Sequence, residues 1–242
     1  MNIAILGYGK MGKMISQYVE NETNDTIALI IDNTDDWKNK AAELKNCDVA
    51  IDFSEPAVAI DNIIACFKNK VPVVCGTTGW YDKLEYVKQM CEKYDGSLVY
   101  ASNFSIGVNI FSEINKRLSK IMEKYAQYEV KVAETHHTAK LDKPSGTAIT
   151  LANQIIENNA TYSDWELTDD ANTKNEHSIP VNSYREGNEV GTHEITWQSA
   201  EDLISIKHKA FSRLGFVKGA LLSAKWILDK KGVFTVNDVV NS

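Results

Sequence analysis

The sequence predicts a doubly wound α/β fold built on a parallel sheet, with an inserted α+β region that carries a mixed or antiparallel sheet of its own. Three observations predict it. Over the first hundred residues, short apolar runs alternate with segments whose apolar residues recur at helical spacing. After Asn103 this alternation stops, and a long helical pattern and several alternating strand patterns follow. A further apolar helix over residues 217–227 then indicates that the chain returns to the first sheet.

The first region contains five apolar runs that are typical of buried parallel strands. The runs are residues 2–6, 26–31, 48–53, 71–75 and 98–101. Between them, helical spacing of apolar residues predicts helices over residues 10–20, 60–67 and 80–94. Right-handed crossovers place such helices on both faces of the sheet, and ligands bind at the edge where the strands have their carboxyl ends. We expect the loops that begin at Gly7, Asp32, Phe53, Gly76 and Ser102 at this edge.

The second region starts with a helix over residues 110–125, a strand over residues 128–133 and a helix over residues 145–158. Residues 158–177 hold five acids against one lysine and few apolar side chains, which predicts a solvated or poorly ordered excursion. Residues 190–197 and 203–208 alternate as half-buried strands and predict an antiparallel pair in a sheet with one open face. We therefore expect two domains, one of residues 1–105 with 214–242 and one of residues 106–213.

Composition excludes several classes of protein. The 242 residues are 43% apolar and 24% charged, as in globular domains and unlike disordered or low-complexity chains. The 33 acidic against 26 basic side chains give a net charge of −7, which argues against nucleic acid or an anionic membrane as the main partner. No apolar run approaches the roughly 18 residues of a membrane-spanning helix, and the N-terminus lacks the basic segment of a secretion signal, so we expect a cytoplasmic protein. The four cysteines show no CxxC spacing and are expected as reduced thiols in the core: Cys47, Cys66, Cys75 and Cys91.

A glycine-rich turn follows the first predicted strand and opens the first predicted helix. Residues 7–12 read Gly-Tyr-Gly-Lys-Met-Gly, the GxGxxG pattern of a dinucleotide site in a Rossmann-type fold. Its glycines allow the backbone to approach a pyrophosphate, and the helix N-terminus supplies N–H groups and partial positive charge. Asp32 ends the second strand twenty residues after Gly12, where an acid accepts hydrogen bonds from the ribose hydroxyls. These features together predict a bound dinucleotide.

The residues after Asp32 indicate which nicotinamide cofactor binds. They are Asn33, Thr34, Asp35 and Asp36, with no arginine to neutralise a 2′-phosphate. NADH is therefore favoured over NADPH, although Lys10, Lys13 and Lys38 leave NADPH open.

A second motif concentrates basic side chains within an acidic protein. Residues 134–148 read ETHHTAKLDKPSGTA, with two histidines and two lysines inside eight residues. We expect no metal here, because neither an HExxH spacing nor a cysteine partner accompanies the histidines. Residues 144–147 instead resemble a helix start whose hydroxyl and N–H groups can bind a carboxylate. An anionic substrate would lie beside His136, His137 and Lys140, which can supply the proton that completes a hydride addition. A solvated basic loop is the alternative.

The whole set of motifs resembles one family. The pattern HHxxKxDxPSGTA, the glycine-rich turn, GTTG at residues 76–79, SNFSIGVN at residues 102–109 and the segment from His208 to Ala220 are similar to dihydrodipicolinate reductases. The resemblance implies reduction of 4-hydroxy-tetrahydrodipicolinate, or of the dihydrodipicolinate derived from it, to tetrahydrodipicolinate by NADH or NADPH in the diaminopimelate route to lysine. It also implies a homotetramer joined through the sheet of the second domain.

The resemblance further implies roles for individual residues. His136 would be the acid/base residue, and Lys140 the proton donor or electrostatic stabiliser. The small dicarboxylate substrate would bind His137, Ser145, Gly146 and Thr147, with Arg213 in support. The dinucleotide would bind Gly7, Lys10, Met11, Gly12 and Asp32 at its pyrophosphate and ribose, and Gly76, Thr78, Asn103 and Phe104 near the nicotinamide, with Phe53 packed against it.

Two other functions fit parts of the sequence. A different dehydrogenase, acting on an amino acid or a semialdehyde, has a similar architecture but gives no reason for HHTAK followed by PSGTA. A catalytically silent protein that senses a dinucleotide would retain the fold, and the presence of both His136 and Lys140 argues against it.

Overall fold

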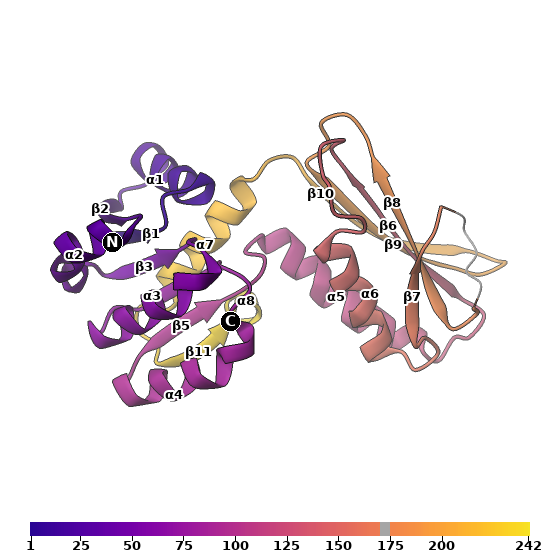
Figure 1. Ribbon diagram of the computed structural model, residues 1–242. Coiled ribbons are helices and arrows are strands. Elements are labelled where there is room, and N and C mark those ends of the chain that lie inside the picture. The colour runs from indigo at the N-terminus through magenta and orange to yellow at the C-terminus, as the bar shows by residue number, and fades with distance from the viewer. Residues whose placement is uncertain (170–174) are drawn as a thin grey trace. The chain divides into compact units, whose positions relative to one another are not determined.

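The computed structural model describes residues 1–169 and 175–242 (Figure 1). The chain forms two compact units. The first consists of Met1–Ile106 and Leu214–Ser242, and the second of Gly107–Arg213. Among the described residues, no helix is both long enough and apolar enough to span a membrane.

The first unit is a parallel sheet of six strands in the order β11-β5-β4-β3-β1-β2. The strands are β1 (Asn2–Leu6), β2 (Thr26–Ile31), β3 (Val49–Asp52), β4 (Val73–Cys75), β5 (Ser97–Tyr100) and β11 (Gly232–Thr235). The helices are α1 (Lys10–Glu22), α2 (Thr34–Lys40), α3 (Pro56–Lys68), α4 (Leu84–Tyr94), α7 (Leu214–Trp226) and α8 (Val236–Val240), with 3-10 turns η1 (Ala41–Asn46) and η2 (Tyr81–Lys83). Figure 1 shows α7, β11 and α8, in yellow, lying with the indigo and magenta elements of this unit.

Helices cover both faces of this sheet, and the side chains of β1 therefore alternate between two hydrophobic cores. Ala4 and Leu6 pack with residues of α3 and α4, whereas Ile3 and Ile5 pack with residues of α1, α7 and α8. This arrangement confirms the predicted doubly wound fold. All five predicted strands form, each within two residues of the expected bounds, and the four cysteines are buried and unpaired. The short strand β11 was not predicted.

The second unit is a mixed sheet of five strands in the order β10-β9-β6-β8-β7. The strands are β6 (Glu129–His136), β7 (Asp164–Leu167), β8 (Ser178–Arg185), β9 (Gly191–Gln198) and β10 (Leu203–Ala210). Strand β9 is antiparallel to β6 and β10, whereas β8 is parallel to β6 and β7. The helices α5 (Ile106–Met122) and α6 (Gly146–Asn158) supply Phe111, Leu151 and Ile155 to a core with alternate residues of the sheet.

Two predictions for this unit need correction, and one strand was missed. The strand expected to end at residue 133 continues to His136, because β8 and β9 pair with β6 over its length. The segment 158–177 is not wholly a loop: residues 164–167 pair with β8 as β7, so tertiary pairing outweighs the acidic composition. Residues 170–174 of that segment lie outside the described residues. Strand β8 was missed because Pro180, Asn182 and Ser183 break the apolar pattern of a buried strand.

Candidate active site

The glycine-rich turn lies between β1 and α1 and has the close backbone contacts that the GxGxxG pattern requires. Gly7 has a φ of +87°, and a Cβ there would lie 2.5 Å from the Phe53 carbonyl oxygen. A Cβ on Gly12 would lie 2.2 Å from the Gly7 carbonyl oxygen. Gly9 is the N-cap of α1 and offers no side chain to the first-turn N–H groups, which have no acceptors within the helix. The exposed Lys10 and half-buried Met11 begin that helix.

Asp32 joins this turn. It follows β2 directly and is exposed, and its Oδ1 accepts a hydrogen bond from the backbone N–H of Tyr8 at 2.5 Å. The carboxylate is thereby held next to the glycines, at the carboxyl edge of the sheet, as the sequence spacing predicts.

The structure also brings together three of the residues expected near the nicotinamide. A Cβ on Gly76 would lie 2.1 Å from Cε1 of Phe53, so the absence of a side chain at Gly76 admits that ring. Phe53 and Phe104 make an edge contact with ring centroids 6.0 Å apart. Thr78 is exposed after β4, and Asn103 accepts a hydrogen bond from the N–H of Ser105 at 2.8 Å.

Asp52 is a buried carboxyl at the same edge that sequence reasoning missed. Thr77 and Ser54 donate hydroxyl hydrogen bonds to its Oδ1, and Asn62 donates to Oδ2 at 2.7 Å. Burial raises its pKa, and these hydrogen bonds oppose that effect. The carboxyl thus ties the loop after β3 to the GTTG loop after β4. An acid at the end of an otherwise apolar run is the signal that could have revealed it.

In the second unit, His136 is the last residue of β6 and lies two residues after Glu134. Side chains two apart along a strand face the same side. Here that side is the one covered by α5 and α6, and both side chains are buried. Nδ1 of His136 lies 3.4 Å from Oε2 of Glu134. His193 of β9 is paired with Glu134 across the sheet, and its Nε2 lies 3.6 Å from the same oxygen.

Glu134 is held by several donors. Its Oε1 accepts from the N–H of Ser145 at 2.9 Å, from the Ser183 hydroxyl and from the Arg185 guanidinium at 3.5 Å. Burial alone would raise the pKa of Glu134, but the neighbouring His193 ring and hydrogen bonds from Ser145 and Ser183 hold it well below its usual range. Glu134 is therefore a carboxylate at neutral pH.

His136 titrates at unusually low pH. Burial is the largest cause and lowers its pKa to about 4, against the opposing charge of Glu134. His193, Lys140 and Arg185 lower it further. Even beside the Glu134 carboxylate, the imidazole is therefore neutral at pH 7 until a further anion binds next to it.

The remaining residues of this motif lie on the loop from His136 to α6. Lys140 pairs with Asp142, with 2.7 Å between Nζ and Oδ1. Ser145 is the N-cap of α6, and its hydroxyl accepts from the N–H of Ala148 at 3.2 Å. Next to it, Gly146 is exposed and no atom would lie within 4 Å of a Cβ there. The N-terminus of α6 is thus open to an anion. His137 and Thr147 are half-buried, and Arg213 is exposed at the end of the unit.

Glu134, His136 and His193 also have the composition of a metal site, with one ligand atom from each lying within 4.8 Å of the others. The guanidinium of Arg185 already supplies a positive charge to the same carboxylate. That charge would repel a divalent cation, and we therefore assign no metal to the cluster.

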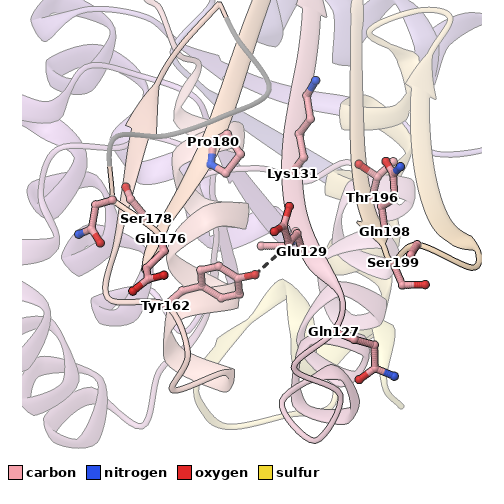
Figure 2. A pocket seen from close by; sticks show the side chains of 13 residues that line it. Gln127, Glu129, Lys131, Tyr162, Glu176, Ser178, Pro180, Thr196, Gln198 and Ser199 are labelled. Atoms are coloured by element: carbon pink, nitrogen blue, oxygen red, sulfur yellow. Dashed lines mark hydrogen bonds between the residues drawn. The ribbon is translucent and has the colours of Figure 1, made fainter.

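An open hollow of about 920 Å³ lies elsewhere on this unit (Figure 2). Figure 2 shows Lys131 and Glu129 of β6 beside Thr196 and Gln198 of β9. The hydroxyl oxygen of Tyr162 accepts a hydrogen bond from the backbone N–H of Val130 at 3.2 Å. These residues come from the start of β6, and His136 ends it. His136 comes five positions after Lys131 along the strand, which is about 16 Å at the usual rise. The hollow is therefore separate from the histidine cluster.

Two family models match the chain. The one described as "Dihydrodipicolinate reductase, N-terminus" matches residues 1–104, and the one described as "Dihydrodipicolinate reductase, C-terminus" matches residues 107–240. The chain belongs to the dihydrodipicolinate reductase family. The resemblance seen in the HHxxKxDxPSGTA and GxGxxG motifs is thereby confirmed.

Curated relatives in this family span nearly the same length. A 4-hydroxy-tetrahydrodipicolinate reductase of Christiangramia forsetii is 46% identical over 241 residues, covering 100% of this chain and 98% of its own. One of Clostridium novyi is 35% identical, covering 97% and 95%. Among solved structures, a dipicolinate-bound dihydrodipicolinate reductase from Paenisporosarcina sp. TG-14 superposes with a TM-score of 0.76, at 21% identity and 97% coverage of both chains. This last likeness supports the fold of the family.

Proposed function

We propose that this member of the family is a 4-hydroxy-tetrahydrodipicolinate reductase. It forms tetrahydrodipicolinate for lysine biosynthesis, using a reduced nicotinamide dinucleotide. The observation that carries this proposal is the combination of His136, His137 and Lys140 with the open N-terminus of α6, which suits a small dianion that must gain a proton. When bound, the dinucleotide would supply a hydride; with the proton that completes the reduction, the 4-hydroxyl group of the substrate would leave as water.

The two units divide this work. Residues 1–105 with 214–242 bind the dinucleotide, and residues 106–213 bind the substrate. At the first site, Gly7, Lys10, Met11 and Gly12 receive the pyrophosphate and Asp32 the ribose. The contact of Gly76 with Phe53 and that of Phe53 with Phe104 support a place for the nicotinamide there, together with Thr78 and Asn103.

NADH is the favoured cofactor. The surroundings of Asp32 support this choice, because the Oδ2 atom of Asp36 accepts the N–H of Asp32 at 3.0 Å, and Lys38 is paired with Asp35 at 3.2 Å. A 2′-phosphate would lie close to a group of carboxylates there, and Lys38 is already paired with one of them.

The substrate would bind with one carboxylate at Ser145, Gly146 and Thr147. His137 would contact it as well, and Arg213 would support its second carboxylate. His136 would exchange the proton. Lys140 would exchange its ion pair with Asp142 for one with the substrate, since Asp142 and the substrate are both anions. There it would either donate a proton or stabilise negative charge.

A homotetramer would form through the sheet of the second unit. The face opposite α5 and α6 exposes side chains such as Leu203, Tyr184 and Lys207. Light scattering on the purified chain tests this assembly: a mass of four chains is expected, and a monomer would contradict it.

A coupled assay tests the activity. The purified chain receives the condensation product of pyruvate and aspartate semialdehyde, and nicotinamide absorbance is followed with NADH and with NADPH in separate reactions. Oxidation of NADH in preference to NADPH is expected. Oxidation of neither would favour a dinucleotide-sensing protein or another substrate, and a preference for NADPH would overturn the cofactor assignment alone.

A further inference from the structure

The strongest feature that the proposed roles leave unused is the buried row of polar side chains beside His136. Register pairs place Ser183, Glu134, His193 and His208 next to one another on four neighbouring strands, β8, β6, β9 and β10. Glu134 and His193 are nearly inaccessible, with 1% and 5% of their surfaces exposed. Buried polar groups of this kind are costly unless they are paired, so a specific role is expected of them.

Two histidine rings converge on one carboxylate oxygen. Oε2 of Glu134 lies 3.4 Å from Nδ1 of His136 and 3.6 Å from Nε2 of His193. Oε2 and the Nδ1 atom of His136 are both buried, and among the described residues neither makes a hydrogen bond. The rings meet edge to face, with centroids 5.1 Å apart. An N–H on each facing nitrogen satisfies the oxygen, whereas lone pairs there would repel it.

His193 connects this carboxylate to the N-cap of α6. Nε2 of His193 lies 3.3 Å from the Ser145 hydroxyl, which caps α6, and the N–H of Ser145 donates to Oε1 of Glu134. A ligand bound at the start of α6 therefore lies next to Ser145, which is hydrogen-bonded to the carboxylate that faces the His136 ring.

Nε2 of His136 lies on the opposite side of the ring, next to the start of β9. A Cβ on Gly191 would lie 3.1 Å from Nε2 of His136, so the glycine at the start of β9 admits the ring in this orientation. The titratable and charged groups around the ring are Glu134 on its own strand, His193 on β9, Arg185 on β8, Lys140 on the following loop and Glu189 before β9.

We propose that Glu134 is a positioning residue for His136, and that His193 shares its carboxylate and couples it to Ser145. Oε2 accepts the Nδ1–H of His136, so the proton sits on Nδ1 and Nε2 is the nitrogen that exchanges a proton with substrate. The exchange of a proton between Nε2 and substrate rests on the proposed function. The position of the proton on Nδ1 concerns the ring alone and is tested without turnover.

Nuclear magnetic resonance of the full chain labelled at its histidines tests the ring. The 15N and 13C resonances of His136, assigned by their loss in His136→Gln, report which nitrogen carries the proton. We expect the Nδ1–H form in the unmodified chain at pH 7.5 and a change in tautomer population in Glu134→Gln. An Nε2–H form in the unmodified chain, or a spectrum unaltered by Glu134→Gln, overturns the placement whatever the enzyme's activity.

Kinetics test the consequence for turnover. Glu134→Gln is expected to lower kcat between about tenfold and a hundredfold, part of the roughly 10²- to 10⁴-fold that acid/base catalysis contributes, with little change in KM for the nucleotide. Because the carboxylate favours the protonated imidazole, the limb of the pH profile due to His136 moves to lower pH in this variant. A merely structural role would lower the amount of active enzyme and leave the profile in place. The matched control is Glu113→Gln, which removes an ion pair with Arg117 on α5. This variant is expected to keep kcat and the pH profile of the unmodified chain.

A double-mutant cycle tests the sharing of the carboxylate. His193→Gln alone is expected to lower kcat less than Glu134→Gln, and the combined variant to lower it no more than Glu134→Gln does. Additive losses contradict a shared carboxylate. Should Glu134→Gln fail to fold, His193→Gln still reports on the His136 tautomer population. If the unmodified chain does not reduce the substrate, the proposed function fails, and the resonance experiment alone decides whether Glu134 positions the His136 ring.

Discussion

At the scale of single residues, the site depends on a histidine that burial keeps neutral and a carboxylate that hydrogen bonds keep charged. His136 and Glu134 are two residues apart, yet their pKa values both move downwards, His136 mainly through burial and Glu134 through its donors. An imidazole in this state requires an anion in addition to Glu134 before it gains a proton near pH 7.

Removal of either proton-handling side chain is expected to affect turnover more than nucleotide binding. His136→Gln or Lys140→Ala should lower kcat at least about a hundredfold, the scale of a lost general acid, and leave the affinity for NADH almost unchanged. Steady-state kinetics and a fluorescence titration with NADH measure the two quantities. Near-normal turnover in either purified variant would contradict its role.

Binding of a dianion should depend on pH through His136. Because the pKa of His136 is about 4 in the free chain and an adjacent dianion raises it, binding takes up a proton and strengthens as pH falls from 8 to 5.5. Calorimetry with dipicolinate in two buffers of different ionisation enthalpy measures this uptake. His136→Gln should remove it, and equal uptake in that variant would exclude His136 as the group that titrates.

At the scale of elements, the glycine-rich turn shows how a short motif positions a strand and a helix. Its spacing and that of Asp32 could be derived from sequence, because both follow the ends of apolar runs. Glu134 could not be placed in the same way: the expected strand stopped at residue 133, and alternation of faces relates Glu134 to His136 only if the strand continues. Strand β8 was similarly obscured, because its polar residues are buried by neighbouring strands that sequence periodicity does not reveal.

Two alanine substitutions in the turn should separate packing from ligand approach. In Gly12→Ala the Cβ would lie 2.2 Å from a backbone oxygen, so we expect a loss of stability of about 1–3 kcal/mol and a lower melting temperature. In Gly9→Ala nothing lies within 4 Å, so the melting temperature should hold while NADH binds more weakly. Thermal unfolding and NADH titration measure both. A Gly12→Ala protein as stable as its parent would disprove the close contact.

At the scale of the whole molecule, the fold class could be predicted because repeated strand and helix patterns dominate the first hundred residues. The strand order of the second sheet could not, since the parallel pairings of β8 with β6 and with β7 depend on contacts between distant segments. Each unit also has its own hydrophobic core. Under the proposed division of work between the units, we expect each to bind its ligand by itself.

Loss of one ligand should therefore leave the other largely unaffected. Asp32→Ala is expected to weaken NADH binding about tenfold or more, since a charged hydrogen-bond acceptor contributes roughly 1.5–3 kcal/mol, while dipicolinate affinity stays within about twofold. Calorimetry with each ligand measures this. Unchanged NADH affinity would remove Asp32 from the cofactor site, and a parallel loss of dipicolinate affinity would contradict separate binding.

The pairing of β11 with β5 joins segments more than a hundred residues apart, and it has a consequence for how the chain is made. Until residues 232–235 leave the ribosome, β5 remains an edge strand with unpaired backbone groups, and the helix α7 is missing from one face of the sheet. Residues 107–213 emerge earlier and hold a core of their own. During synthesis, the second unit can therefore become complete before the first, although the first begins the chain.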